Sequence, residues 1–295
     1  MRAERLFEGG DPFLTEHGGF YYIYCTTENA RKLENPNAFD TEKNGVDGIY
    51  VYRSKDLQKW ENCGLCLRKE DVIGEKWFWA PEVSYYRNRF YMVYTAEEHL
   101  AIAVSDSPTG PFKRYSDGWL MENHAIDGHL MFTSDGAYLY YVGFDHANVI
   151  YAAKLSDDLM TVEYKNPTAL IKAEAAWERT DGLVAEGPFV IQHKGLYYLT
   201  YSCNHTRSKD YAIGYAVSND PFGPFRKYEG NPILHRYGAI EGTGHGSFLQ
   251  VADNRYLFAY HCHSVNPDNF KPRMVCICEA GFEKGNKEDI LTVYE

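Results

Sequence analysis

Ionisable side chains recur at one point of a repeated pattern in this chain. Asp11, Glu82, Asp127 and Glu186 each open a segment rich in aromatic residues, and His245 opens a fifth such segment. If the fold brings these segment starts together, the carboxylates crowd and raise one another's pKa. Because such crowding is costly, a cluster of acids more often serves chemistry than stability. Any one of these acids could instead cap a turn, but turn capping does not explain why acids recur at the same point of several repeats.

Two carboxyl groups with separated pKa values can hydrolyse a glycosidic bond. One group stays protonated and donates to the leaving oxygen, while the other stays ionised and either activates water or attacks carbon. A separation of about 6.5–9.5 Å leaves room for the water and inverts the sugar, whereas about 5–5.5 Å gives retention. Opposite sides of a ring of segments could supply the wider gap.

The segments that must position these residues repeat five times. Each repeat reads as a short strand, a tight turn, a Tyr-rich strand, a loop and two further strands. The clearest copy starts at Glu186, with EGPFVIQHKGLYYLTYS followed by YAIGYAVSNDPFGPFRKY. Gly, Asn and Asp in the turns, as at Lys194-Gly195 and Asp253-Asn254, suit tight hairpins.

Five such units predict an all-β fold, a five-bladed β-propeller with four-stranded antiparallel blades around a central channel. A β-sandwich would give fewer strands, and no linker divides the chain, so we expect one propeller domain over residues 1–295. The first strand of a blade is innermost, so the five polar residues should line the channel mouth. The polar segment 28–47 predicts a long surface loop over one face.

The amino-acid composition excludes some classes of binding partner. The 295 residues include 30 Lys and Arg against 41 Asp and Glu, a net charge of −11. This acidic balance argues against nucleic acid, whose phosphates are bound by Lys and Arg. No stretch approaches the roughly eighteen apolar residues of a membrane span, and the first ten residues lack an apolar signal core. We therefore expect no membrane contact and a cytoplasmic protein, unless a signal segment has been removed.

The seven cysteines follow no disulfide pattern. Their number is odd and their spacing irregular, which favours a reducing compartment. Cys63 and Cys66 have the spacing of a redox pair or half a zinc site, but no second pair matches it. We interpret the cysteines as structural thiols.

Five motifs, one in each repeat, resemble those of glycoside hydrolase family 43. They are Gly10-Asp11-Pro12, Trp79-Ala80-Pro81-Glu82, Ile126-Asp127, Glu186-Gly187-Pro188 and Gly244-His245-Gly246-Ser247. The resemblance covers nearly the whole chain and implies a five-bladed propeller glycosidase acting on arabinose- and xylose-containing glycans. Two residues depart from the family pattern: Gly128 stands where many relatives have proline, and Gly246 is unusually small for its position. These departures leave the subfamily unassigned.

The resemblance also implies residue roles. Asp11 matches the general base that activates water, and Glu186 matches the general acid. Asp127 matches a third acid that orients Glu186 and keeps its pKa raised. His245 matches a channel residue that can ligate calcium or another ion, directly or through water, with a hydrogen-bonded histidine as the alternative. No cofactor is required, although a structural calcium ion in the channel is an option.

Three further residues are expected to contact the substrate. Arg273 resembles a fifth-blade arginine that contacts the sugar beside the acids, unless it is an ordinary surface arginine. Trp79 could pack its ring against a sugar, and Phe78 could take that part instead, with a core position as the alternative for both. Glu82 is interpreted as structural or as a distant hydroxyl contact.

The predicted function is an inverting glycoside hydrolase that releases α-L-arabinofuranose, β-D-xylose or both from plant-type glycans or oligosaccharides. One alternative is a propeller glycosidase for another sugar, a galactoside or a fructoside, or a retaining enzyme. Another is a propeller that binds carbohydrate or protein without catalysis, although such a scaffold has no need for three acids at the channel mouth. The sequence does not determine the oligomeric state.

Overall fold

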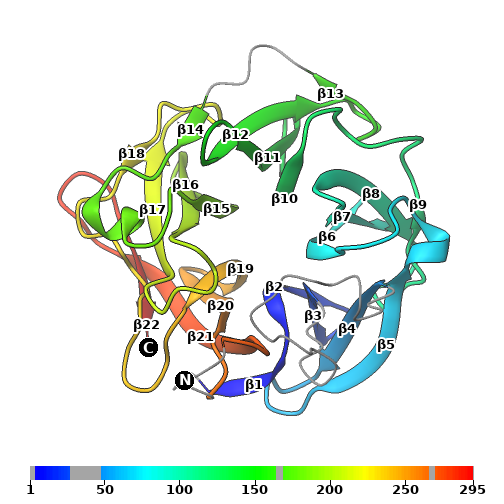
Figure 1. The fold of residues 1–295 in the computed structure, drawn as a ribbon, viewed down its shortest axis with the longest axis horizontal. Helices are drawn as coiled ribbons and strands as arrows, with labels where there is room; N and C mark the ends of the chain where they lie inside the picture. The colour runs from blue at the N-terminus through cyan, green and yellow to red at the C-terminus, as the bar shows by residue number, and fades with distance from the viewer. Residues whose placement is uncertain (1–3, 27–47, 164–168, 266–269, 295) are drawn as a thin grey trace.

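The strands of this protein form five antiparallel sheets arranged in a ring (Figure 1). The computed structural model describes residues 4–26, 48–163, 169–265 and 270–294. This arrangement confirms the predicted five-bladed β-propeller. The segment 28–47, predicted to be a surface loop, lies outside the described residues.

Each blade runs outward from an innermost strand, in chain order. Blade 1 contains β2 (Gly10–His17), β3 (Phe20–Thr26), β4 (Gly48–Ser54) and β5 (Glu61–Arg68). Blade 2 contains β6 (Trp79–Tyr86), β7 (Arg89–Ala96), β8 (His99–Ser105) and β9 (Lys113–Arg114). Blade 3 contains β10 (Ala125–Thr133), β11 (Gly136–Phe144), β12 (Asn148–Leu155) and β13 (Val162–Glu163), with β14 (Ala169–Ile171) also paired to β12. Blade 4 contains β15 (Ala185–His193), β16 (Leu196–Cys203), β17 (Ala212–Ser218) and β18 (Arg226–Lys227).

The fifth blade joins the two ends of the chain. Its inner strands are β19 (Gly244–Ala252), β20 (Arg255–Cys262) and β21 (Met274–Glu283). The N-terminal strand β1 (Arg5–Glu8) and the C-terminal strand β22 (Ile290–Tyr294) both pair with β21. The repeat pattern did not reveal β1, which closes the ring by joining the blade that the chain builds last.

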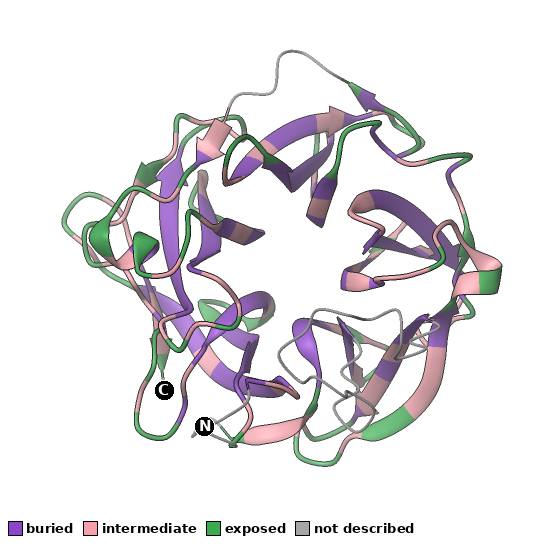
Figure 2. Ribbon diagram, viewed as in Figure 1, coloured by how far each residue is buried: buried purple, intermediate pink, exposed green. Residues whose placement is uncertain are grey.

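Aromatic side chains fill the space between and within the blades. Several tyrosines on the second strands are fully buried, among them Tyr24, Tyr94, Tyr140, Tyr198 and Tyr260. Their ring areas supply much of the apolar burial of the fold, and their hydroxyl groups reach polar partners. Tyr94, for example, donates to the Ile73 carbonyl at 2.9 Å. Figure 2 shows this burial along the inner strands, with the connecting loops exposed.

Two short 3₁₀ helices, η2 (Lys69–Asp71) and η3 (Ala176–Arg179), accompany the strands in the described residues. No helix in that part of the chain is long and apolar enough to cross a membrane. All seven cysteines are free thiols and six of them are buried. Cys66, for example, donates its thiol to the Ile49 carbonyl, as expected for a structural cysteine.

Candidate active site

Every innermost strand contains a bulge near its start. The strand pairing slips between Gly10 and Phe13, Trp79 and Glu82, Ile126 and His129, Glu186 and Phe189, and Gly244 and Ser247. One residue in each bulge has a positive φ of 42–57°: Asp11, Ala80, Asp127, Gly187 and His245. Bulges redirect side chains, and strained backbone of this kind concentrates at functional sites.

The bulges correct the expected alignment of the five polar residues. Asp11, Asp127 and His245 occupy equivalent positions, but the matching residues in blades 2 and 4 are Ala80 and Gly187. Glu186 therefore stands one residue before the equivalent position, and Glu82 stands two residues after its own. The sequence could not reveal these offsets, because each repeat has a polar residue near the start and the bulge alone defines the register.

A side chain from the preceding blade holds each bulge in place. The backbone N–H of Ala80 donates to the Thr26 hydroxyl at 2.8 Å, and that of Asp127 donates to Thr95 at 3.1 Å. The N–H of His245 donates to Ser202 at 2.8 Å. These acceptors lie near the ends of the second strands, so each blade fixes the bulge of the next.

Blade 3 departs from this arrangement. Val142 pairs with Ile126 at the place where other blades carry a hydroxyl group or an imidazole, and it offers no acceptor. The carboxylate of Asp127 takes over this role and accepts the backbone N–H of Gly187 at 3.1 Å. Asp127 thereby fixes the backbone directly after Glu186.

Asp11 is surrounded by groups that favour its ionised form. Its Oδ1 accepts from Arg273 at 2.7 Å, and its Oδ2 accepts from the Thr26 hydroxyl at 2.7 Å. Burial raises the pKa of this carboxyl group, but the charges of Arg273 and His245 outweigh burial and hold the pKa well below its usual value. Asp11 is therefore a carboxylate at neutral pH.

His261 supports Asp11 as a neutral imidazole. The backbone N–H of Asp11 donates to Nδ1 of His261 at 3.1 Å, so this nitrogen carries no proton. Burial and the nearby Arg273 lower the pKa of His261 to about 3. The 3.3 Å approach of the same Nδ1 to the Asp11 carboxylate is accordingly a contact and not an ion pair.

Glu186 has the opposite environment. Its carboxyl group accepts from the Tyr211 hydroxyl at 2.8 Å and from the Asn148 amide at 3.2 Å. Burial and the charge of Asp127 raise the pKa of Glu186 to about 8. Glu186 is thus mostly protonated at neutral pH and can donate a proton.

His245 lies between the acids. Its Nδ1 is 3.3 Å from Asp11 Oδ1 and 3.7 Å from Asp127 Oδ2. Burial lowers the pKa of His245, but Asp11, Asp127 and Glu186 together raise it above its usual value. Burial, followed by the charge of Asp11, raises the pKa of Asp127 despite the opposing effect of His245. The cluster therefore combines an ionised Asp11, a protonated Glu186 and, in His245, an imidazole whose protonated form is favoured.

The chain matches a known protein family over most of its length. The family model described as "Glycosyl hydrolases family 43" matches residues 7–285. The chain belongs to glycoside hydrolase family 43. This membership confirms the family resemblance that the five motifs suggested.

Individual relatives of this family 43 glycosidase carry several activities in their names. A crystal structure titled endo-1,4-beta-xylanase from Bacteroides thetaiotaomicron is 34% identical, with a TM-score of 0.87, and the match covers 100% of this chain and 96% of that one. A beta-xylosidase of Xylanibacter ruminicola is 27% identical over 90% of this chain and 92% of its own. A beta-D-galactofuranosidase of Aspergillus niger is 24% identical over 80% of this chain and 72% of its own.

The expected substrate-contact residues of this family 43 enzyme lie in different surroundings. Arg273 is buried beside Asp11, within the cluster of acids. Trp79 is partly exposed at the start of β6, and its ring stacks on Trp77 with centroids 5.8 Å apart. Phe78 is only 2% exposed and stacks on Tyr94, which favours its core alternative.

Glu82 makes a structural contact. Nε2 of His129 accepts the backbone N–H of Val190 at 3.1 Å, so the Nδ1 proton of a neutral imidazole points to Glu82, 2.7 Å away. This chain of contacts joins the innermost strands of blades 2, 3 and 4. It favours the structural interpretation of Glu82 over a contact with a distant sugar hydroxyl.

The donor set around His245 does not fit a directly bound calcium ion. Calcium takes about six to eight oxygen ligands. The described residues contain no group of three or more His, Cys, Asp or Glu side chains arranged to hold a metal. The oxygens of Asp11 already accept hydrogen bonds from Arg273 and Thr26.

Sequence reasoning missed four residues of the site. Tyr211 and Asn148 hold the carboxyl group of Glu186, and Thr26 and His261 hold Asp11. Glycines make room for two of the contacts: a Cβ at Gly244 would lie 1.9 Å from the Tyr211 ring, and one at Gly10 would lie 2.1 Å from the Arg273 guanidinium. In the sequence, these two glycines were the available sign that a bulky side chain packs against the motif, because each directly precedes the bulge residue.

Proposed function

We propose that this family 43 glycosidase hydrolyses terminal pentosides, α-L-arabinofuranosides, β-D-xylosides or both, with inversion. The main support for this mechanism is that the pKa values of the two carboxyl groups are shifted in opposite directions. The pKa of Asp11 is lowered, and that of Glu186 is raised to about 8. The choice of pentose is supported by the xylosidase and arabinosidase names of several relatives.

The reaction proceeds in one step. Asp11 accepts a proton from water as the water oxygen bonds to the anomeric carbon. The bond from that carbon to the leaving oxygen breaks, and Glu186 protonates this oxygen. Asp127 positions Glu186 through its hydrogen bond to the Gly187 N–H, and its charge helps to keep the acid protonated.

A panel of nitrophenyl glycosides tests the function. The panel contains the α-L-arabinofuranoside, β-D-xylopyranoside, β-D-galactopyranoside, β-D-galactofuranoside and β-D-fructofuranoside, each assayed with the wild type and Glu186→Ala. We expect turnover of at least one pentoside, with a large loss in the variant. Because nitrophenol needs little acid assistance, some residual activity should survive. Exclusive turnover of another sugar would contradict the pentose assignment, and no turnover would favour a binding propeller.

Stereochemistry tests the mechanism separately. Proton NMR of the freshly released sugar should show the anomer opposite to that of the substrate. Retained configuration would instead require a covalent intermediate and would contradict Asp11 as general base.

We propose further that catalysis requires no bound metal ion. Two observations support this proposal. Both carboxylate oxygens of Asp11 already accept hydrogen bonds, from Arg273 and from Thr26. His245 lies 3.3 Å from the same carboxylate, where its imidazole can pair with the negative charge. Treatment with EDTA should leave kcat/KM unchanged. A loss of activity that calcium restores would overturn this part of the proposal.

A further inference from the structure

A short loop of blade 4, residues 204–211 between β16 and β17, borders the general acid. At its end Tyr211 is fully buried, and its hydroxyl donates to Glu186 at 2.8 Å. The ring of Tyr211 also stacks on His261, with centroids 5.5 Å apart. His261 in turn accepts the backbone N–H of Asp11. The end of the loop therefore contacts the acid directly and the base through one intermediate side chain.

The start of the loop supports the base. Because Nδ1 of His261 accepts from Asp11, the proton of this neutral imidazole lies on Nε2, which is 3.3 Å from the Thr206 hydroxyl. Nη1 of Arg273 donates to the same hydroxyl at 3.5 Å. The Thr206 carbonyl accepts from Nε2 of His263 at 2.8 Å. Thr206 thus contacts two of the side chains that hold Asp11.

Asn204 fixes both ends of this loop. Its side chain is fully buried, and its amide nitrogen donates at 2.8 Å to the carbonyl of Asp210, next to Tyr211, and to that of Trp177 in η3. Its amide oxygen accepts the backbone N–H of Asp181 at 3.0 Å. All three partners are backbone groups, and the loss of such bonds in a buried place is costly.

The backbone at this position also favours asparagine. The φ of Asn204 is +71°, in the left-handed region that asparagine enters more readily than most residues. Asparagine supplies this turn together with all three hydrogen bonds. Glycine would adopt the turn but has no amide, and aspartate lacks the two N–H donors.

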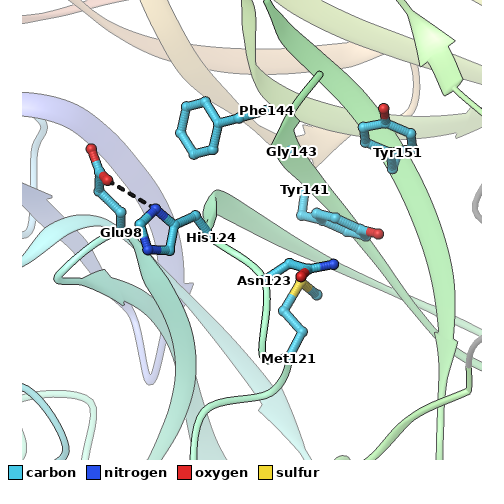
Figure 3. Close-up of a pocket in the computed structure, with 8 residues that line it drawn as sticks. All are labelled: Glu98, Met121, Asn123, His124, Tyr141, Gly143, Phe144 and Tyr151. Atoms are coloured by element: carbon cyan, nitrogen blue, oxygen red, sulfur yellow. Dashed lines mark ion pairs between the residues drawn. The ribbon is translucent and has the colours of Figure 1, made fainter. Parts of the chain in front are cut away.

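Asn204 itself does not contact the substrate. Its side chain has no exposed surface. A hollow of about 720 Å³ between blades 2 and 3 is lined by residues that fall between Glu98 and Tyr151, and none of them belongs to the loop (Figure 3). An effect of Asn204 on catalysis therefore passes through the loop that it holds.

We propose that Asn204 is a positioning residue for both the general acid and the general base, because it fixes the loop 204–211 that contacts the supports of each. Tyr211 transmits its effect to the acid, and Thr206 transmits it to the side chains around the base. The inference rests on the proposed function and adds to it a residue that acts on the reaction from outside the site.

The first test is Asn204→Gly, which removes the amide without straining the left-handed backbone. The substrate is whichever nitrophenyl glycoside the wild type hydrolyses. We expect kcat and kcat/KM to fall together by about tenfold or more, since misplaced catalytic groups slow the reaction without weakening substrate binding. The alkaline limb of the pH profile should also move, because Glu186 loses a fixed Tyr211 hydroxyl.

Asn231→Ala is the matched control. Asn231 also makes three hydrogen bonds through its amide in blade 4, with the N–H and the carbonyl of Tyr215 and with the Tyr201 hydroxyl. None of these bonds reaches the loop 204–211, so this variant should lose stability but keep the wild-type kcat and pH profile. Both variants are assayed at a temperature where circular dichroism shows them to be folded.

A double-mutant cycle with Tyr211→Phe tests the route of the effect. Burial and the charge of Asp127 raise the pKa of Glu186 whereas the Tyr211 hydroxyl lowers it, so Tyr211→Phe alone should move the alkaline limb to higher pH. In the Asn204→Gly background the same change should add little to the loss of kcat, because the hydroxyl is already displaced.

Two results would overturn the inference and leave the proposed function intact. One is a cycle in which the two effects on kcat simply add. The other is an Asn204→Gly enzyme that is less stable but has the kcat and pH profile of the wild type. A wild type that hydrolyses no glycoside of the panel would instead contradict the proposed function, and the inference with it.

Discussion

At the scale of single residues, the surroundings of two carboxyl groups separate their proton affinities. Arg273, His245 and Thr26 favour a charged Asp11, whereas burial and Asp127 favour a neutral Glu186. Residue types alone did not distinguish these environments. The assignment of base and acid came from family resemblance, and the contacts now supply its physical reason.

The pH dependence of kcat/KM follows from these two shifts. We expect activity to fall on the alkaline side as Glu186 loses its proton near pH 8. On the acidic side it should fall only well below the usual pKa of a carboxyl group, where Asp11 gains a proton. Glu186→Gln should abolish the alkaline limb of the residual activity on a nitrophenyl substrate. An alkaline limb that persists in this variant would assign it to another group.

Arg273 should control the acidic limb. Arg273→Met removes the cation 2.7 Å from Asp11, so the pKa of Asp11 should rise and the acidic limb should move up by about one to three units. Arg273→Lys keeps the charge and should move the limb less. Equal pH profiles in both variants, with only KM altered, would mean that Arg273 acts on the sugar alone.

At the scale of the elements, the bulges of the innermost strands aim the functional side chains. Each bulge residue adopts a positive φ, and a side chain of the preceding blade accepts its N–H. This arrangement couples the site to the packing of neighbouring blades. It predicts that a buried hydroxyl group that only supports the backbone of an active-site residue affects both stability and activity.

Thr95 provides the test. Thr95→Val leaves the buried N–H of Asp127 without an acceptor, which should lower the free energy of unfolding by about 1–3 kcal/mol and reduce kcat. Thr95→Ser should restore most of both, because Ser202 performs the same task for His245. Urea unfolding and nitrophenyl pentoside kinetics measure the two effects. Full activity and stability in the valine variant would show that the bulge needs no acceptor.

At the scale of the whole molecule, the ring is closed by β1. This strand pairs with β21, and the ring of Phe7 stacks on Tyr52 with centroids 4.1 Å apart, so it bridges blades 5 and 1. Closure keeps Asp11, which follows β1 directly, opposite Arg273 and His261 of blade 5. The geometry of the general base therefore depends on the meeting of the chain ends.

Removal of residues 1–8 should expose this dependence. Without β1 the fifth blade loses a strand pairing, so the unfolding temperature should fall by several degrees, since about 1 kcal/mol shifts it by ~2–4 °C in a domain of 150–250 residues. Activity should fall below the wild-type value even at temperatures where the truncated protein stays folded, because Asp11 loses its support. Differential scanning calorimetry and kinetics at low temperature measure these changes. Wild-type values in both would contradict a role of β1 in closure.

The sequence by itself determined the blade number, the strand order and the motifs that carry the acids, because alternating aromatic segments and turn residues are local signals repeated five times. It also placed Asp11, Asp127 and Glu186 at the starts of innermost strands. Only the tertiary structure decided the offsets among these starts, the hydroxyl groups that hold the bulges, the role of Asp127 where Val142 offers no acceptor, and the closing strand β1. Each of these depends on contacts between neighbouring blades, from residues far apart in the chain, which local patterns do not encode.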